Sequence, residues 1–307
     1  MEKYDLAIIG AGPAGLNAAI YGARYGLKAI VIGGITGGLA STTHEIGNWL
    51  GTEKITGWDL AQNMVKHVKS YNTPIIERMV TGISKDGDTF RVEIAGVEPV
   101  EAKAILLAMG TSHRSLGVAG EKQFMGKGIS YCATCDGFFY KRKTVAVVGG
   151  NDAAAMAASY LGDIAAKVYL IYRKNELQAE HVWQEAIAKN PKIEIVYNTV
   201  ITEIKGEAKV GSVVVENTNG EKSEIITDGV FIEIGSEPNT DLLKDLGVET
   251  DDQGFVKIKA GGETTADGVW AAGDLTDGSN KFRQIITAAA EGAIATVSIQ
   301  KYLKQKK

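Results

Sequence analysis

The sequence predicts an α/β protein built from two Rossmann-like nucleotide-binding domains, with the second inserted into the first. Two observations carry this prediction. A glycine-rich turn separates an apolar strand from a helix at residues 10–15, and a related turn follows another strand at residues 149–154. The chain of 307 residues is long enough for two domains, each with its own core. The two turns lie too far apart in sequence for the repeats of a solenoid.

The composition is that of an ordinary globular protein. Hydrophobic residues make up 45% and charged residues 23% of the chain, which argues against disorder. The net charge of −4 argues against nucleic-acid binding, which needs a basic face. The chain has no apolar run of membrane-spanning length, and residues 2–5 do not resemble a signal peptide. We therefore expect a cytoplasmic protein whose partners include neither nucleic acid nor membrane.

The first nucleotide unit occupies the start of the chain. Residues 4–9 are a short apolar run, typical of a buried parallel strand, and the turn Gly10-Ala11-Gly12-Pro13-Ala14-Gly15 follows it. The next helix carries its apolar residues on one face up to Gly26, and residues 28–32 form the second strand. In this context the three fingerprint glycines allow a tight turn, close approach to a pyrophosphate, and close helix packing.

The second unit repeats this pattern with one departure. Residues 144–148 are a strand, residues 155–161 a helix and residues 167–172 a second strand, around the turn at 149–154. Asn151 stands where the fingerprint has its middle glycine. The backbone has to approach the pyrophosphate at that position, so a side chain there is an obstacle.

The ends of both units indicate how the domains are connected. Strands over residues 104–111 and 229–235 close the two units, and a late strand ends in Gly273-Asp274 before a helix over about residues 284–303. The first domain is therefore expected to be discontinuous. The expected bounds are 1–113 with 240–307 for the first domain and 114–239 for the second, which carries both cysteines.

The two cysteines of the chain, Cys132 and Cys135, are three residues apart and precede the second fingerprint. Such a pair can switch between a dithiol and a disulfide, and a helix start at this point would lower the pKa of one thiol. Half of a zinc site is the alternative, but zinc takes four ligands, and the histidines have no ligand spacing. The histidines are His44, His67, His113 and His181. We expect no metal.

Further motifs accompany the fingerprints and the cysteine pair. They are Gly37-Gly38, Asn48-Trp49, Cys132-Ala133-Thr134-Cys135-Asp136-Gly137, Gly273-Asp274 and Arg283-Gln284. With these motifs in this order, the chain resembles the low-molecular-weight thioredoxin reductases along essentially its full length. A CxxC between the two fingerprints distinguishes them from glutathione-reductase-like enzymes, whose disulfide lies early. The resemblance implies two FAD/NAD(P)-binding domains, FAD, a redox-active disulfide, a homodimer and a thioredoxin-like protein as substrate.

The resemblance also implies the roles of individual residues. Cys135 faces the flavin, Cys132 is the outer thiolate that attacks the disulfide of the substrate, and Asp136 exchanges the proton. His44 and Trp49 lie in the segment expected to wrap the flavin, as cofactor contacts or as ordinary packing. The expected flavin-binding residues are Gly10, Gly12, Pro13, Ala14, Gly15, Gly33, Gly37, Gly38, Leu39, Thr43, Asn48, Gly110, Gly273, Asp274, Arg283, Gln284 and Ile285.

The electron donor depends on the second fingerprint. The residues expected to bind NADPH are Gly149, Asn151, Asp152, Ala153, Arg173 and Lys174. Where the family reads the 2′-phosphate with His-Arg-Arg-x-x-x-Arg, residues 172–178 read Tyr-Arg-Lys-Asn-Glu-Leu-Gln, and Gln178 cannot replace a charge. The two basic residues that remain favour NADPH. The alternative is a degenerate site in a reductase fed by ferredoxin, a deazaflavin or NADH, as in relatives that lack the nicotinamide motifs.

Two other function classes remain open from the sequence. A flavoprotein NAD(P)H oxidase that uses oxygen would need no cysteine pair. A flavin-bearing redox sensor would use the cysteine pair to report on a partner without multiple turnover.

Overall fold

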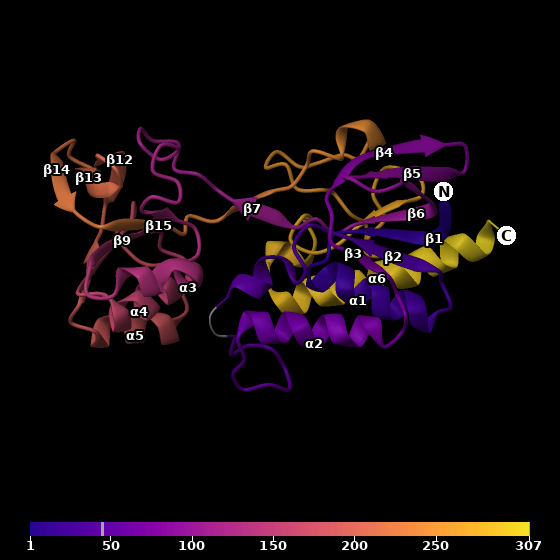
Figure 1. Ribbon diagram of the computed structural model, residues 1–307, viewed down its shortest axis with the longest axis horizontal. Helices are drawn as coiled ribbons and strands as arrows, with labels where there is room; N and C mark the ends of the chain where they lie inside the picture. The colour runs from indigo at the N-terminus through magenta and orange to yellow at the C-terminus, as the bar shows by residue number, and fades with distance from the viewer. Residues whose placement is uncertain (44–45, 307) are drawn as a thin grey trace. The chain divides into compact units, whose positions relative to one another are not determined.

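The computed structural model describes residues 1–43 and 46–306, so the prediction for His44 lies outside the described residues. The chain divides into two compact units (Figure 1). Unit 1 comprises Met1–Ser112 and Pro238–Lys307, and unit 2 comprises His113–Glu237. The prediction of an α/β fold with one domain inserted into the other is confirmed.

Unit 1 is built on a mainly parallel sheet with the strand order β3-β2-β1-β6, extended by β5 and β4. β1 pairs with β6 along its length, while the other edge of β6 is shared by β5 and β17. The elements are β1 (Glu2–Ile9), α1 (Pro13–Arg24), β2 (Ala29–Ile32), η1 (Gly38–Thr42), α2 (Gly57–Lys69), β3 (Ile75–Ile76), β4 (Val80–Asp86), β5 (Thr89–Ile94), β6 (Val100–Leu107), η3 (Lys244–Leu246), β17 (Val269–Ala271), η4 (Ser279–Lys281) and α6 (Ile285–Gln305).

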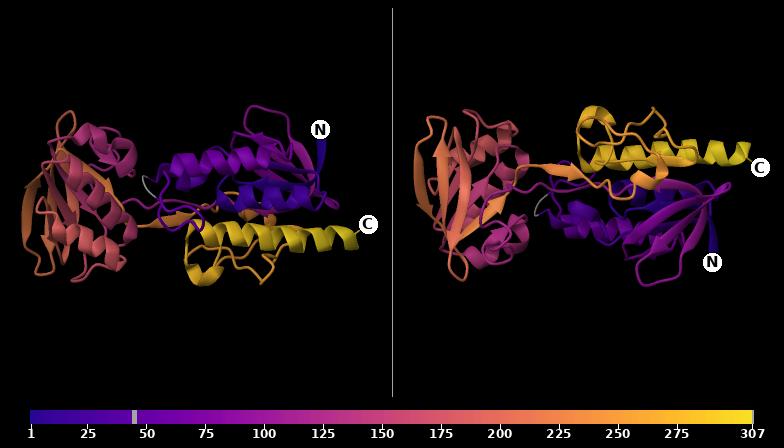
Figure 2. Two further views of the ribbon diagram at one scale, coloured as in Figure 1. Left: turned by 90° about the horizontal axis from the view of Figure 1, so that it is seen from below. Right: turned by 90° about the horizontal axis from the view of Figure 1, so that it is seen from above.

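The alternation of side chains along β1 divides the core of unit 1 into two layers. Leu6 and Ile8 pack against α1, α2 and α6, which Figure 1 shows on one side of the sheet. Ala7 and Ile9 pack on the other face against β4, β5 and the segment 242–275. Figure 2 shows α6 and this late segment from two further sides. Burial of β1 on both faces explains its nearly continuous apolar run.

Unit 2 repeats this arrangement with a parallel sheet of order β11-β10-β9-β15-β8. The helices α4 and α5 cover one face, and the antiparallel sheet β12-β13-β14 covers the other. The elements are β8 (Ile129–Ser130), α3 (Ala133–Asp136), η2 (Gly137–Tyr140), β9 (Thr144–Val148), α4 (Asp152–Ile164), β10 (Lys167–Ile171), α5 (His181–Lys189), β11 (Ile193–Val196), β12 (Thr199–Gly206), β13 (Val210–Asn217), β14 (Lys222–Ile226) and β15 (Gly229–Ile232).

The helix of the second fingerprint is longer than its sequence pattern predicted. The apolar spacing predicted a helix over 155–161, whereas α4 extends over Asp152–Ile164. Asn151 caps the helix with its side chain, which allows the first turn to begin at the fingerprint itself. The two crossings between the units, β7 (Thr111–His113) and β16 (Ser236–Pro238), pair with each other as a small sheet.

A buried carboxylate organises the start of unit 2. Glu121 is 3% exposed, and its two oxygens accept hydrogen bonds from the backbone N–H groups of Leu116 and Gly117 at 2.9 and 2.7 Å. The hydroxyl of Tyr131 donates a third bond to it at 2.6 Å. The charge is therefore fully hydrogen-bonded, as a buried carboxylate has to be.

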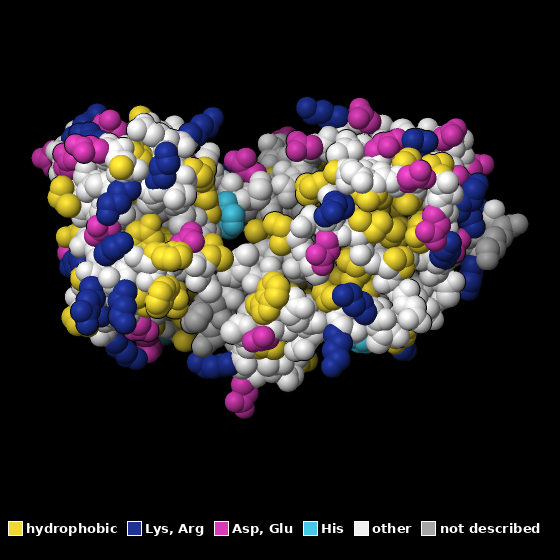
Figure 3. Space-filling view, viewed as in Figure 1, with side chains coloured by type: hydrophobic (Ala, Val, Ile, Leu, Met, Phe, Trp, Pro, Cys, Tyr) yellow, Lys and Arg dark blue, Asp and Glu magenta, His cyan; other side chains and the backbone are white. Residues whose placement is uncertain are grey.

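Charged side chains of both signs are interspersed on the visible face of each unit (Figure 3). Within residues 1–43 and 46–306, no helix combines the length and the apolar composition needed to cross a membrane.

The contact between α1 and α6 provides a test of the packing in unit 1. A Cβ atom added at Gly292 would lie 2.1 Å from the carbonyl oxygen of Ala14, so the two helices would have to separate. We expect Gly292→Ala to lower the free energy of unfolding by about 2 kcal/mol, as overpacking commonly does. The measurement is denaturant unfolding followed by circular dichroism.

Gly22 is the matched control, because it lies in α1 and also faces α6. A Cβ atom at Gly22 would meet Ala29 at 3.5 Å and Thr296 at 4.0 Å, which are ordinary contacts. We expect Gly22→Ala to leave stability unchanged or to raise it by about 0.5 kcal/mol, because alanine favours the helix. An equal loss in both variants would contradict this description of the helix contact.

Candidate functional site

The first fingerprint forms a turn in which each glycine meets a different constraint. Gly10 has a φ of +122°, and a Cβ there would lie 2.1 Å from the carbonyl oxygen of Ala108. A Cβ at Gly15 would lie 1.9 Å from the carbonyl oxygen of Gly10. Gly12 differs, since a Cβ there would meet only Gly38, at 3.9 Å. Gly10 and Gly15 are therefore required by packing, whereas Gly12 leaves space in front of the helix.

Two further glycine segments close around this turn. The backbone N–H of Gly37 donates to the carbonyl oxygen of Ala11 at 2.8 Å. Gly38, with a φ of +58°, lies against Gly12, and a Cβ at Gly33 would lie 2.5 Å from the backbone nitrogen of Ala11. These contacts bring the carboxyl ends of β1 and β2 to the start of α1, where α/β folds bind ligands.

The start of α1 keeps its amide groups available. Gly12 is the N-cap residue of α1, no side chain of the described residues caps this helix start, and the first turn of α1 contains no acidic residue. The first N–H groups of a helix have no partner inside the helix and carry its positive dipole end. This turn therefore has the properties of an anion-binding site.

A carboxylate of α6 organises the turn at Gly273-Asp274. Glu291 accepts hydrogen bonds from the N–H of Gly273 at 2.8 Å and from the hydroxyls of Thr276 and Ser279 at 3.0 and 2.6 Å. Burial raises the pKa of Asp274 to about 6; Arg283 opposes this shift and the charge of Glu291 adds to it. The sequence prediction missed Glu291, although a lone acid among the small residues of α6 was a usable signal.

Arg283 supplies the most specific evidence for a ligand in unit 1. Its Nε and Nη2 atoms are buried and have no hydrogen-bond partner within the described part of the chain. The guanidinium lies 3.8 Å from the centroid of the Phe255 ring, which holds its orientation. Buried donors on a cation cost free energy when they are unpaired, so this pair of donors fits an anionic or carbonyl-bearing ligand.

The other residues predicted to bind the flavin lie in these loops or in the chain segments next to them. The side-chain amide of Asn48 donates to Gln284 at 3.0 Å, and Gln284 forms a capping box with Thr287 at the start of α6. Gly110 has a φ of +61° with open space around it, and Leu39 is 37% exposed. Pro13 and Ala14 open α1, Ile285 opens α6, and the carbonyl of Thr43 accepts the N–H of Gly57.

The two cysteines form a disulfide at the start of α3 in unit 2. Cys132 is the N-cap residue, and its Sγ accepts a hydrogen bond from the backbone N–H of Cys135 at 3.1 Å. Cys135 is exposed and Cys132 is half-buried. A donated N–H bond stabilises the thiolate form of a reduced cysteine, so Cys132 is the better placed of the two to serve as a nucleophile. Asp136 ends the same helical turn.

Two aromatic side chains next to the disulfide are exposed. Phe138 and Phe139 lie in η2, which begins directly after the end of α3, and are 71% and 68% exposed, with their rings edge to face at 6.4 Å. Exposed aromatic surface of this kind marks sites of protein contact. The sequence interpretation did not single out these residues, although an adjacent phenylalanine pair beside a redox motif was visible.

The second fingerprint has the same backbone path but a different start of its helix. Gly149, with a φ of +143°, packs against the carbonyl oxygen of Glu233, as Gly10 packs against Ala108. The side chain of Asn151 accepts a hydrogen bond from the N–H of Ala154 at 3.0 Å. Asp152 and Ala153 follow in the first turn of α4, and Arg173 and Lys174 are exposed after β10.

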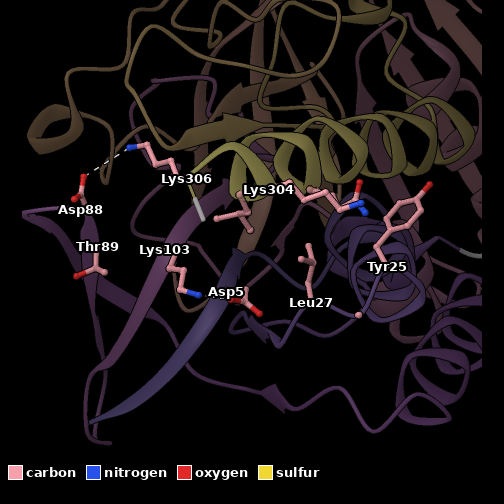
Figure 4. Close-up of a pocket in the computed structure, with 11 residues that line it drawn as sticks. Asp5, Tyr25, Leu27, Asp88, Thr89, Lys103, Lys304 and Lys306 are labelled. Atoms are coloured by element: carbon pink, nitrogen blue, oxygen red, sulfur yellow. Dashed lines mark hydrogen bonds and ion pairs between the residues drawn. The ribbon is translucent and has the colours of Figure 1, made fainter.

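A separate pocket of about 320 Å³ lies at the amino ends of the strands of unit 1 (Figure 4). Two ion pairs lie at this pocket, Lys103 with Asp5 at 2.8 Å and Lys306 with Asp88 at 3.7 Å, and Lys304 also lines it. The fingerprint turn lies at the opposite, carboxyl ends of β1 and β2, and we assign the pocket no role in the chemistry. No cluster of metal-binding side chains occurs among the residues that the structure describes.

A half-buried carboxyl group follows β15, beside the second fingerprint. Burial raises the pKa of Glu233 to about 8, from an ordinary value of 4.5. The folded protein therefore binds a proton here that the unfolded chain releases, and the stability this contributes is present below pH 4.5 and lost as the pH rises through about 8.

We expect Glu233→Gln to remove this pH dependence. Relative to the parent protein, the variant should gain stability as the pH rises from 5 to 9, by up to about 4 kcal/mol. Thermal unfolding across this range measures the difference. Glu207→Gln, at an exposed turn residue, is the control and should leave the curve unchanged. A Glu233→Gln curve parallel to that of the parent protein would contradict the prediction.

Comparison with known proteins agrees with this geometry. A sequence model of the family Pyr_redox_2, pyridine nucleotide-disulphide oxidoreductase, matches residues 4–292. A thioredoxin reductase from Bacillus subtilis is 39% identical over 305 residues, covering 98% of this chain and 95% of the relative. One from Mycolicibacterium smegmatis is 41% identical over 308 residues, covering 98% of this chain and 97% of the relative.

A solved structure is also similar over the whole chain. The crystal structure of Lactococcus lactis thioredoxin reductase, in its FR conformation, has a TM-score of 0.94 at 35% sequence identity. The match covers 98% of this chain and 99% of that one. The two-domain fold, the position of the disulfide and a sequence similarity that covers 98% of the chain all indicate the same family. The chain therefore belongs to the pyridine nucleotide-disulphide oxidoreductases and, within them, to the low-molecular-weight thioredoxin reductase family.

Proposed function

We propose that this protein is a thioredoxin-disulfide reductase. It passes electrons from a reduced donor, by way of FAD, to the Cys132–Cys135 disulfide and from there to a thioredoxin-like protein. The observation that carries the proposal is the disulfide itself, since it joins both cysteines of the chain at a helix start where Cys135 is exposed, beside two exposed phenylalanines. Cytoplasmic location and assembly into a homodimer stay predictions; the mass of the protein in solution tests the dimer.

The loops of unit 1 supply the residues that would hold FAD. The open start of α1 behind Gly12 would receive the diphosphate, and the unpaired donors of Arg283 would complete the site from the late segment. Asp274 is half-buried and within electrostatic reach of Arg283 and Glu291, and its carboxyl group can bind a hydroxyl of the ligand. When bound, FAD accepts a pair of electrons and hands them on to the disulfide.

The dithiol would reduce the substrate by thiol–disulfide exchange. The Cys132 thiolate attacks one sulfur of the substrate disulfide, forming a mixed disulfide and releasing the first substrate thiolate. Cys135 then attacks Cys132, which restores the Cys132–Cys135 bond and releases the second substrate thiolate. Two electrons and two protons pass to the substrate. Asp136, at the end of the same turn, is the proposed proton donor.

The surroundings of the disulfide favour a protein as substrate. The N–H group of Cys135 stabilises negative charge on Cys132, which would favour attack at neutral pH. Phe138 and Phe139 provide apolar surface beside the sulfurs, where a protein can dock. A flavin oxidase would use neither feature. A redox sensor would use both but would not turn over repeatedly with oxidised thioredoxin, which a multiple-turnover assay decides.

The order of the two cysteines is the first testable consequence. We expect Cys135→Ser, which keeps Cys132, to accumulate a covalent mixed disulfide with a thioredoxin that keeps only its first active-site cysteine, presented as a mixed disulfide with a small thiol, because neither protein then has a second thiol to release it. Cys132→Ser should accumulate much less, and both variants should lose essentially all turnover. Non-reducing electrophoresis and mass spectrometry detect the product. Trapping by Cys132→Ser instead of Cys135→Ser would reverse the assigned roles.

The second consequence concerns the flavin. We expect Arg283→Met, which keeps the bulk of the side chain, to weaken FAD binding by roughly tenfold or more, since a charged hydrogen-bonding group is lost. The ratio of flavin to protein after purification, and titration of stripped protein with FAD, measure this. Arg78→Met, at an exposed arginine, is the control. Full retention of flavin in Arg283→Met would contradict the proposed site.

A further inference from the structure

The chain contains two glycine-rich turns with nearly the same backbone, and their helix starts differ. At α1 the N-cap residue is Gly12, with no side-chain cap and no acid in the first turn. At α4 the N-cap residue is Asn151, with a side-chain cap and an acid, Asp152, in the first turn. A dinucleotide needs the first arrangement, because its pyrophosphate binds the free amide groups of the turn.

Asn151 uses one of these amide groups itself. Its Oδ1 accepts the N–H of Ala154 at 3.0 Å, so the side chain lies in front of the helix start where a phosphate oxygen would lie. The carboxylate of Asp152 adds a negative charge at the positive end of the helix. It accepts the backbone N–H of Glu180 at 2.6 Å, which ties the loop after β10 to this end of α4.

Tyr172 covers the turn from the side of β10. A Cβ at Gly150 would lie 2.4 to 2.5 Å from carbon atoms of the Tyr172 ring, so the ring packs directly on the backbone of the turn. The ring is buried, and its hydroxyl donates to Gln178 at 3.2 Å. The N–H of Gln178 donates to the carbonyl oxygen of Gly150 at 2.7 Å. The loop over residues 172–180 is thus fastened to the fingerprint at several points.

The charges facing this turn do not favour an anion. Asp152 places a carboxylate at the helix start. Arg173 and Lys174 are exposed, and the position expected to carry a further arginine is Gln178. The sequence favoured NADPH because Arg173 and Lys174 remain. The contacts of Asn151, Asp152 and Tyr172 at the turn itself are the stronger evidence, and they disfavour a dinucleotide.

We infer that the second fingerprint does not bind a dinucleotide. Asn151 takes an amide group that a pyrophosphate requires, Asp152 adds negative charge at the helix start, and the Tyr172 ring packs on the backbone of the turn. Unit 2 is then a scaffold for the disulfide. If the protein has the proposed function, the electrons that reduce its flavin then come from a donor that does not bind at this fingerprint.

Binding to the flavin-loaded protein tests the inference without an activity assay. We expect isothermal calorimetry with NADPH and with NADH to show no saturable binding below about 1 mM. We also expect neither nucleotide to bleach the flavin absorbance under anaerobic conditions. Saturable binding of either nucleotide with a dissociation constant below about 1 mM would overturn the inference.

Substitutions test which residues close the turn. Asn151→Gly removes the cap at little cost to the helix, and Asn151→Gly with Tyr172→Val also uncovers Gly150. We expect the double variant to bind NADPH with a dissociation constant of about 100 µM or less, at least about tenfold below the limit of about 1 mM expected for the parent protein. Asn219→Gly, in the turn between β13 and β14, is the control and should gain nothing. No gain in a folded double variant, as judged by its thermal unfolding, would overturn the assignment to these residues.

A third measurement separates this inference from the proposed function. The flavin-loaded protein is reduced with dithionite, freed of excess reductant, and mixed with oxidised thioredoxin. Formation of reduced thioredoxin supports the proposed function whatever the nucleotide does. Its absence would overturn that function and leave the result on nucleotide binding unaffected.

Discussion

Helix amide groups that are left without a partner inside the helix must be satisfied by something else, and this requirement separates the two halves of the molecule. In unit 1 the N-cap is Gly12, and the amides at the start of α1 remain for a ligand. In unit 2 the same backbone path ends in Asn151, and the chain satisfies the helix with its own side chain. The two units share a fold, but only one keeps the site that the fold commonly serves.

The rest of the chemistry follows from this division. Unit 1 adds buried, unpaired donors of Arg283 to its open turn and holds the neighbouring loop with Glu291. Unit 2 uses the surface of its helix layer differently: it presents the disulfide at the start of α3 and two exposed aromatic rings beside it.

Much of this could be predicted from the sequence, because the signals were local. The glycine turns lie between apolar strands and patterned helices, so the fold and the insertion followed from periodicity and order. The contacts of Tyr172 and Glu291 could not be predicted in this way, since they join residues that are distant in the chain or depend on side-chain direction. Asn151 was recognised as an obstacle, but its role as a cap depends on the direction of its side chain.

The central claim is that electrons leave the flavin through the Cys132–Cys135 pair. The most direct measurement is an anaerobic reductive titration of the flavin-loaded protein, followed by absorbance. The account predicts uptake of about four electrons per chain, about two by the flavin and about two by the disulfide. The variant with both cysteines replaced by serine should take up about two and reduce no thioredoxin. Equal uptake by the two proteins, or thioredoxin reduction by the serine variant, would contradict the account.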